Sequence, residues 1–307
     1  MTKIPVILDV DTGMDDALAI LLTIDQPNLQ LLGIACVYGN APIEETYRNT
    51  RSIAKVLNIK VPISKGAAYP MINKILHSRE VRLLKDFGTF KIGLDGEKHV
   101  MLASAMYVKL LGEAVEPVTI IATGPLTNVA HVIQNHPELL PKIKAISFMG
   151  GSLSVGNITR YAEFNAYSDP EALNIVLNSK LPLTMAGLDI TRSTFITLKV
   201  ILKKIKTPNL TQKIFIDLID FYTEKNKHKE NLEGIQLHDS FAVMAVSNPE
   251  LFVGEMKQIT VNISKDERRG ETTISSETPN VFVLNTVTSK SMINLTIDSI
   301  HHIEVTP

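Results

Sequence analysis

The chain has 307 residues, 45% of them hydrophobic, which is enough for one large α/β domain or two small ones. Its formal net charge is −1 and it has no basic block, which disfavours binding to nucleic acid. The single cysteine, Cys36, excludes a disulfide within the chain and favours a place in the core. Because no charged-then-apolar leader and no bilayer-length apolar run is present, we expect a soluble, cytoplasmic protein without a membrane partner.

Apolar strand-like segments alternate with helical patterns through the first two thirds of the chain. The expected strands cover residues 4–8, 31–37, 61–64, 118–122, 145–149 and 183–187. The helices expected between most of them cover residues 17–24, 43–57, 103–113, 127–135 and 170–177. This alternation predicts an α/β fold with an open, mostly parallel sheet flanked by helices.

The last third of the chain has a different pattern. Residues 196–245 are largely helical in character. Three late strands, at 259–263, 271–275 and 281–284, precede a final helix over 289–300. Since no change in composition and no Ser/Gly/Pro linker divides the chain, we expect a single domain over residues 1–307.

Four aspartates occur within the short run Asp9-Val-Asp11-Thr-Gly-Met-Asp15-Asp16, between two apolar stretches. Ionised carboxylates this close together repel one another, and burial penalises each of them. A hard cation such as Ca²⁺ or Mg²⁺ removes both penalties. A turn at Gly13 would place Asp15 and Asp16 in the first turn of a helix, where the helix dipole favours negative charge. The alternative is a helix cap followed by an acidic surface turn.

Polar residues follow several of the expected strands, and in a parallel sheet these positions line one crevice with the acidic run. They are Asn40, Thr123 in Thr123-Gly-Pro-Leu-Thr-Asn128, Met149-Gly-Gly151, and Asp189. Each of them alone could be a turn or a cap, and for Asn128 we expect a structural role because Asn and Thr commonly organise turns.

Two further segments carry polar side chains without a strong nucleophile. Asn157, Glu163 and Asn165 offer hydrogen-bond donors and acceptors, which suits recognition of a polyhydroxylated ligand such as a sugar. The alternative is a polar loop ahead of a helix, and for Asp169, in Asp-Pro-Glu, we expect the helix cap.

The run Leu237-His238-Asp239-Ser240 precedes an apolar helix start. The pair could be a cap, but Asp239 could also complete a metal site and His238 could act as a general acid.

Together these segments resemble the inosine-uridine nucleoside hydrolase family over nearly the whole chain. The acidic run resembles the signature motif of that family. The segments that follow in the family's order are Val37-Tyr-Gly-Asn40, Thr123 to Asn128, Met149-Gly-Gly151, Asn157 to Asn165, His238-Asp239 and the late strand motif Arg268-Arg-Gly-Glu-Thr272. The resemblance implies a Rossmann-like fold and Ca²⁺-dependent hydrolysis of the N-glycosidic bond of ribonucleosides to ribose and free base. It also implies a role in nucleoside salvage or catabolism and a homodimer or homotetramer.

The resemblance also assigns roles position by position. Asp11, Asp16, Asp239 and the backbone carbonyl of Thr123 would hold Ca²⁺, with Asp9 supporting these ligands from behind. Asp11 would take a proton from a metal-bound water, and His238 would protonate the leaving base. The implied ribose contacts are Asp15, Asn40, Met149, Asn157, Glu163, Asn165 and Asp239.

Two departures from the family pattern concern the base. Many pyrimidine-preferring members carry a second histidine before a Gly-Leu-Asp-Gly stretch. Here the residues directly before Gly93-Leu-Asp-Gly96, Gly88-Thr-Phe-Lys-Ile92, contain no histidine. His77, further upstream, could be a substitute. The chain has no tryptophan, so it cannot sandwich a purine as one subgroup does. Tyr222, Phe221 or Tyr161 could provide an aromatic contact or could be ordinary packing residues. Purine or pyrimidine preference therefore stays open.

Two other functions compete at this stage. Asp9-Val-Asp11-Thr resembles the start of the aspartate-nucleophile phosphatases, in which Asp9 would be phosphorylated with Mg²⁺ as the metal. That family needs a hydroxyl or β-branched residue where Gly13 stands, and a later Gly-Asp motif that is not evident here. The alternative without catalysis is a Ca²⁺-dependent ribose-binding protein, in which Asp11→Asn would leave function intact.

Overall fold

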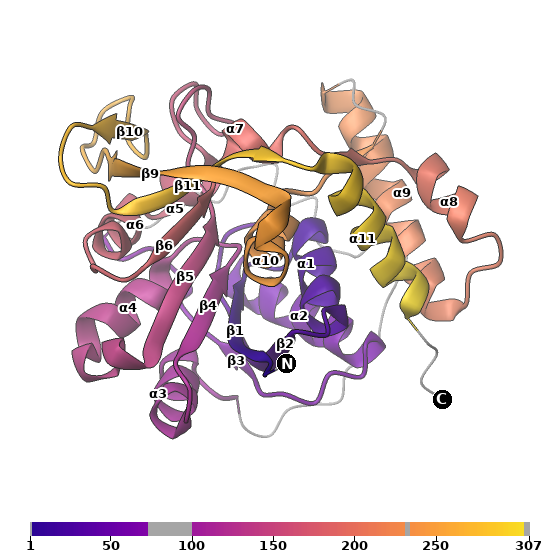
Figure 1. Cartoon of the computed structure of the whole chain (residues 1–307), viewed down its shortest axis with the longest axis horizontal. Coiled ribbons are helices and arrows are strands. Elements are labelled where there is room, and N and C mark those ends of the chain that lie inside the picture. Colours follow the sequence, from indigo (N-terminus) through magenta and orange to yellow (C-terminus); the bar gives the residue numbers. More distant parts are fainter. Residues whose placement is uncertain (1, 73–99, 231–233, 304–307) are drawn as a thin grey trace.

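The computed structural model describes residues 2–72, 100–230 and 234–303. Among them a nine-stranded sheet has the order β10-β9-β11-β6-β5-β4-β1-β2-β3 (Figure 1). Its strands are β1 (Ile4–Val10), β2 (Leu29–Cys36), β3 (Ile63–Lys65), β4 (Val118–Ala122), β5 (Ile143–Met149), β6 (Leu183–Ala186), β9 (Phe252–Val261), β10 (Thr272–Ser275) and β11 (Val281–Val287). Strands β1 to β6 and β11 pair in parallel, whereas β9 is antiparallel to both β10 and β11.

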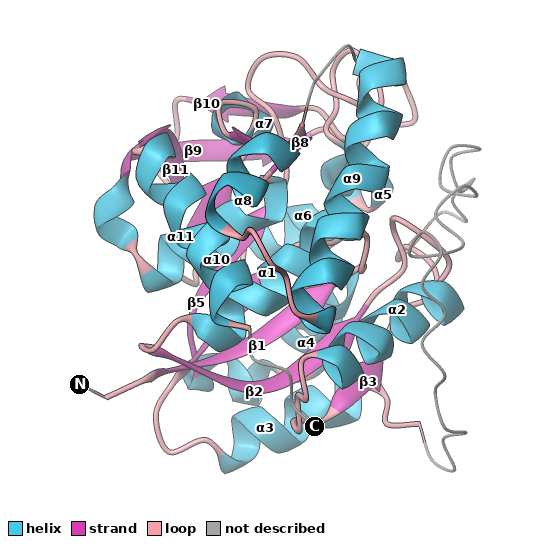
Figure 2. Ribbon diagram, turned by 90° about the vertical axis from the view of Figure 1, so that its right-hand side faces the viewer, coloured by secondary structure: helices cyan, strands magenta, loops and turns pink. Residues whose placement is uncertain are grey.

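Helices cover both faces of this sheet. They are α1 (Met14–Asp25), α2 (Ile43–Val56), α3 (Ala103–Glu113), α4 (Thr127–Asn135), α5 (Phe164–Ser168), α6 (Pro170–Leu177), α7 (Leu188–Thr191), α8 (Leu198–Lys204), α9 (Leu210–Glu230), α10 (His238–Ser247) and α11 (Ser289–His302). Two 3₁₀ helices, Pro137–Lys142 and Pro249–Leu251, and a short hairpin of β7 (Phe195–Ile196) and β8 (Ile235–Gln236) complete the described elements. In Figure 2 helices α8 to α11 lie together on the side of α1.

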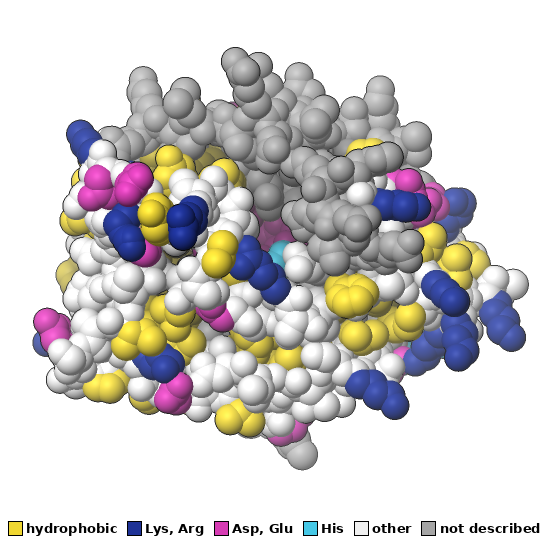
Figure 3. Space-filling model, turned by 90° about the horizontal axis from the view of Figure 1, so that it is seen from above, with side chains coloured by type: hydrophobic (Ala, Val, Ile, Leu, Met, Phe, Trp, Pro, Cys, Tyr) yellow, Lys and Arg dark blue, Asp and Glu magenta, His cyan; other side chains and the backbone are white. Residues whose placement is uncertain are grey.

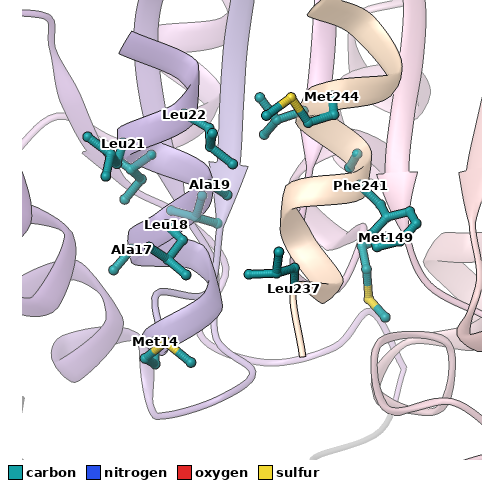
Figure 4. Close-up of a cluster of buried hydrophobic side chains, with 14 of the residues drawn as sticks. Met14, Ala17, Leu18, Ala19, Leu21, Leu22, Met149, Leu237, Phe241 and Met244 are labelled. Atoms are coloured by element: carbon teal, nitrogen blue, oxygen red, sulfur yellow. The ribbon is translucent and has the colours of Figure 1, made fainter. Parts of the chain in front are cut away.

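The core consists of two apolar layers, one on each face of the sheet. One layer contains α1, α10 and α11, and the other contains α3, α4 and α6. The middle of α1, Ala17 to Leu22, is apolar and buried on every side because the sheet, α10 and α11 all pack against the helix. Figure 4 shows Leu237, the residue before α10, pointing toward Leu18 and Leu22 of α1, whereas Phe241 lies on the other side of α10 beside Met149. This contact fixes the first turns of the two helices relative to each other.

The predicted α/β class with an open, mostly parallel sheet is confirmed, and the differences lie at element ends. Strand β1 continues to Val10, so Asp9 belongs to the strand. Strand β9 begins at Phe252 rather than at residue 259, because its first half is exposed and carries no apolar pattern. The two-residue strands β7 and β8, inside the segment predicted to be largely helical, are too short for any periodicity. No helix among the described residues could cross a membrane.

Candidate active site

The site lies at the carboxyl ends of the parallel strands. Strands β1, β4, β5 and β6 are neighbours in the sheet, so the loops that follow them meet at one edge. Figure 3 views this edge from above and shows acidic side chains and a histidine at the bottom of a hollow. The crevice predicted from the polar residues at strand ends is therefore present.

Asp16 joins the loops that follow β1, β2 and β4. Its Oδ2 accepts hydrogen bonds from the backbone N–H of Gly13 at 2.8 Å and from Asn40 Nδ2 at 3.2 Å. Its Oδ1 accepts from the hydroxyl of Thr123 at 2.6 Å. The backbone N–H of Asn40 donates to Asp11 Oδ2 at 2.7 Å. Asn40, predicted as a ribose contact, thus also orients two of the predicted metal ligands.

Asp239 completes a group of carboxylates from distant parts of the chain. One oxygen from each of Asp15, Asp16 and Asp239 lies within 4.8 Å of the others. Burial, and after it the charge of neighbouring carboxylates, raises the pKa of Asp15 to about 7 and the pKa values of Asp11 and Asp239 well above their ordinary range. No lysine or arginine among the described residues forms an ion pair with these four carboxylates. A buried, all-oxygen cluster without a cationic side chain fits a hard divalent cation.

Asp9 lies behind this group and has other partners. Its carboxylate accepts hydrogen bonds from the hydroxyl of Tyr107 at 2.7 Å and from Asn128 Nδ2 at 3.2 Å. Asn128 also donates to the carbonyl of Cys36 at 3.0 Å and accepts from the backbone N–H of Ala67 at 2.8 Å. Asn128 is therefore structural, as predicted, and Cys36 is buried in the core.

Asn165 of α5 links the carbonyl of Thr123 to Met149, the last residue of β5. Asn165 Nδ2 donates to this carbonyl at 2.7 Å and to the carbonyl of Met149 at 3.1 Å. The side chains of Asn165 and Met149 are both buried, and Met149 Sδ lies 3.6 Å from the same amide nitrogen. The predicted carbonyl ligand thus adjoins two of the predicted ribose contacts.

Glu163 and Asp169 are both helix caps. The carboxylate of Glu163 accepts from the backbone N–H groups of Gly151, Asn165 and Ala166 at 2.9 to 3.0 Å, and so begins α5. Asp169 accepts from the backbone N–H of Ala172 at 3.0 Å and begins α6, which confirms the predicted cap.

Asn157 and Asp189 lie on the rim of the site. Asn157 is exposed, and its Oδ1 accepts from the backbone N–H of Phe164 at 2.8 Å. Asp189 follows β6 as predicted, but its carboxylate is bound to the loop at Leu153 and Ser154.

His238 lies at the start of α10 with both ring nitrogens bonded. Nε2 lies 2.9 Å from Gln236 Oε1, and Nδ1 lies 2.7 Å from the hydroxyl of Thr191. Because the Gln236 oxygen can only accept, Nε2 carries the proton and Nδ1 accepts from Thr191. Burial, followed by the charge of Arg192, lowers the pKa of His238 to about 4, so the ring is neutral at pH 7. Neither Thr191 nor Gln236 was predicted as a partner, since neither belongs to a motif.

The candidate aromatic residues differ in their surroundings. Burial, and after it the charges of Asp15 and Asp16, raise the pKa of the Tyr222 hydroxyl. Phe221 is 41% exposed and packs edge-on against Tyr222, with ring centroids 5.6 Å apart. Tyr161 is covered by the guanidinium of Arg268, 4.4 Å from the ring centroid. His77 and Gly93 to Gly96 lie outside the described residues.

Comparison with known proteins decides the family. The family model described as inosine-uridine preferring nucleoside hydrolase matches residues 6–294. The chain belongs to this family. It is 34% identical to the pyrimidine-specific ribonucleoside hydrolase RihA of Escherichia coli (strain K12) over 310 residues, which cover 96% of this chain and 97% of that protein.

Solved structures share the fold. A purine-preferring ribonucleoside hydrolase from Gardnerella vaginalis superposes with a TM-score of 0.88 at 28% identity, covering 97% of this chain and 98% of that one. A plant nucleoside hydrolase, PpNRh1, gives a TM-score of 0.86 at 24% identity over 99% of both chains and shows the fold alone. These matches confirm the family and the enzyme class predicted from the sequence, a hydrolase of N-glycosyl bonds, in place of a phosphatase or a ribose-binding protein.

Proposed function

We propose that this protein is a Ca²⁺-dependent ribonucleoside hydrolase that releases ribose and a free base. The observation that carries the proposal is the convergence of Asp15, Asp16 and Asp239 within 4.8 Å. Asp11 and the polar residues of the neighbouring strand ends adjoin this group. Membership of a metal-dependent family supports it.

The donor set of the cluster suits Ca²⁺. This ion takes about six to eight oxygen ligands and tolerates irregular geometry. Asp11, Asp16, Asp239 and the carbonyl of Thr123 are the proposed ligands, with Asp9 held behind them by Tyr107 and Asn128. Bound Ca²⁺ would neutralise the mutual repulsion of the carboxylates and would lower the pKa of a water only moderately, so a carboxylate base is still required.

Asp11 is the proposed base. Its Oδ2 accepts the backbone N–H of Asn40, which holds the carboxylate in one orientation. We propose that Asp11 takes a proton from the water that attacks the anomeric carbon. Glycosidic cleavage passes through a state with positive charge on the sugar ring, and the surrounding carboxylates stabilise that charge.

The remaining polar residues are the proposed ribose contacts. Asp15 and Asp239 offer carboxylate acceptors on the floor of the site, and Met149 lines the pocket. The proposed contacts to the other hydroxyls come from Asn40, Asn157, Glu163 and Asn165. Their buried neighbours orient them before substrate arrives, which lowers the entropy cost of binding.

His238 is the proposed acid for the leaving base. The ring is neutral at pH 7 but retains the Nε2–H, which Gln236 accepts in the free protein. We propose that this N–H turns to the departing base and stabilises its negative charge. His238→Ala should then slow uridine more than 4-nitrophenyl riboside, whose leaving group needs no acid. Equal losses for the two substrates would remove His238 from this role.

The reaction and the metal can be tested together. Reducing-sugar release should be measured from uridine, cytidine, inosine and adenosine, before and after chelation of Ca²⁺ and after its restoration. We expect chelator-sensitive release that Asp11→Asn lowers by about 10² to 10⁴-fold. Asp217→Asn is the matched control, because Asp217 is partly exposed and, among the described residues, pairs only with Lys213. No release from any of the four by folded protein with Ca²⁺ would contradict the proposal.

Assembly and location are separate proposals. We propose a homodimer or homotetramer in the cytoplasm, as the family resemblance implies. Light scattering tests the assembly, because a monomer would have a mass of 33.9 kDa. Cell fractionation tests the location.

A further inference from the structure

The segment between β5 and α5 carries two proposed ribose contacts, Asn157 and Glu163. We call residues 150–163 the ribose loop. It contains no helix, and its only strand-like pairing is an isolated bridge at Ala162. A loop without regular structure keeps one conformation only if other elements hold it.

Strand β10 holds one side of the ribose loop. The buried Thr272 Oγ1 accepts from the backbone N–H of Ser152 at 2.9 Å and donates to the carbonyl of the same residue at 2.8 Å. The adjacent Glu271 forms the bridge with Ala162. Two consecutive residues thus contact both the outgoing and the returning arm of the loop.

Helix α7 and the residue after it hold the other side. Asp189 accepts from the backbone N–H of Leu153 at 2.7 Å and from the hydroxyl of Ser154 at 2.5 Å. The guanidinium of Arg192 donates to the carbonyls of Val155 at 2.7 Å and Gly156 at 2.8 Å. Every residue from 152 to 156 is therefore bonded to β10 or to the α7 region, and Asn157 comes directly after them.

The turn before β10 is itself anchored to the helices below the site. Arg269 forms an ion pair with Glu171 of α6 at 2.6 Å, and both side chains are largely buried. Gly270 has a φ of +79°, and a Cβ at this position would lie 2.6 Å from the Cα of Tyr167. The turn packs closely against α5 and cannot move freely.

Hydrogen bonds, and not apolar packing, carry the contact between the loop and β10. A cleft of about 150 Å³ lies between them, lined by Ser152, Ser154, Tyr161, Thr272 and Thr273 among others. Because little apolar surface fills this junction, removing the Thr272 hydroxyl should free the loop without disturbing the core.

We propose that Thr272 and Asp189 are positioning residues that hold the ribose loop in its substrate-binding conformation, an inference that rests on the proposed function. They act through the loop and do not touch the reacting atoms. If the loop is released, substrate must order it again, and that cost falls equally on the bound ground state and on the transition state. Such a loss raises KM and leaves kcat unchanged.

The test compares substitutions of two neighbouring threonines. Thr272→Val keeps the shape and removes both bonds to Ser152, whereas Thr272→Ser keeps the hydroxyl. Thr273→Val is the matched control, because the Thr273 side chain is exposed on the same strand and, within the described part of the chain, bonds only to Thr260. Asp189→Ala tests the side of the ribose loop that faces α7. Because Asp189 is exposed, this test is informative even if Thr272→Val does not fold.

We expect Thr272→Val and Asp189→Ala each to raise KM for the best nucleoside by about tenfold, with kcat within about twofold. Thr272→Ser should restore KM, and Thr273→Val should match the parent protein. Backbone amide exchange over residues 150–163 should accelerate in the first two variants, while exchange in β1 and α1 stays the same.

The exchange measurement needs no substrate, so it separates this inference from the proposed function. A parent protein that hydrolyses no nucleoside would overturn the function, and the exchange comparison would still decide whether these residues hold the loop. The inference would be overturned if Thr272→Val and Asp189→Ala showed the same amide exchange and the same KM as Thr273→Val. A loss confined to kcat would overturn it as well.

Discussion

Gly39 lies against the proposed base, and replacing it with alanine should remove most of the activity. A Cβ at this position lies 2.0 Å from Asp11 Oδ2 and 2.8 Å from its Cγ, whereas ordinary contacts to a Cβ are 3.4–4 Å. The carboxylate must therefore withdraw by more than about 1 Å. The 2.7 Å hydrogen bond from the backbone N–H of Asn40 to Asp11 would be lost in the process.

The expected size of the effect follows from this displacement. Misplacing a reacting group by about 1 Å costs on the order of 100-fold in rate, and a general base contributes about 10² to 10⁴-fold. We therefore expect kcat for Gly39→Ala to fall by about 10² to 10³-fold. KM should change less, since the proposed ribose contacts of the other loops remain. The variant should also lose about 1–2 kcal/mol of stability, because alanine adopts the φ of +157° less readily than glycine.

The control is the same substitution where space is free. Gly112 is exposed in α3, and a Cβ there meets no atom within 4 Å. Gly112→Ala should leave kcat unchanged and stabilise the protein by about 0.5–1 kcal/mol, since alanine favours the helix. Ribose release at saturating nucleoside measures kcat, and circular dichroism shows that each variant is folded. A folded Gly39→Ala enzyme with kcat within about fivefold of the parent would refute the placement of Asp11 as the base.

Three further outcomes are expected. Removal of Ca²⁺ by a chelator should lower the Tm by about 4 °C relative to protein with free Ca²⁺ at 100 times its Kd, because binding at that concentration adds about 2.7 kcal/mol to the free energy of unfolding. An unchanged Tm would count against the metal site. Burial raises the pKa of Asp9 to about 7 in the folded protein. At pH 8 Asp9 is ionised, and the buried charge lowers the free energy of unfolding of the chelated protein. As the pH falls through 7, Asp9 takes up a proton in the folded protein and this destabilisation disappears. Between pH 8 and pH 5 the free energy of unfolding of the parent should therefore rise by about 2.5 kcal/mol relative to that of Asp9→Asn, as measured in denaturant titrations. A difference between the two proteins that stays constant with pH would contradict the raised pKa. Phe241 is fully buried on α10 with its ring 5.8 Å from that of Phe252, so Phe241→Ala should cost about 3–5 kcal/mol in urea unfolding. A cost below about 1 kcal/mol would show that Phe241 is not tightly packed between α10 and its neighbours.

The parallel half of the fold could be predicted because its strands are buried on both faces. Such strands appear in the sequence as continuous apolar runs, and the residues that follow them gather at one edge. The same rule brought Asn40 and Thr123 to the acidic run without any structure. It failed for the start of β9, where exposed residues alternate with half-buried ones, and for the two-residue strands β7 and β8.

Side-chain directions at the strand ends could not be predicted. Asp189 follows β6 at the expected place, but its carboxylate faces the ribose loop, where it accepts from Leu153 N and Ser154 Oγ. Similarly, Thr191 comes to His238 from a segment distant in sequence, and Gln236, two residues before it, turns its side chain back to the ring. A motif identifies residues that can do chemistry, whereas their partners depend on how the loops cross.

Base preference is a different problem from the chemistry of the sugar. Relatives of the chain differ in their bases: one is named pyrimidine-specific and another purine-preferring. Membership of the family therefore does not set the preference between bases. Among the described residues one candidate is Tyr222 of α9, because the charges of Asp15 and Asp16 act on its hydroxyl and help to raise its pKa although it belongs to no strand end. Substitutions that change the ranking of uridine and inosine without changing the requirement for Ca²⁺ should therefore lie outside the carboxylate cluster, and Tyr222→Phe and Tyr222→Leu are the first to measure.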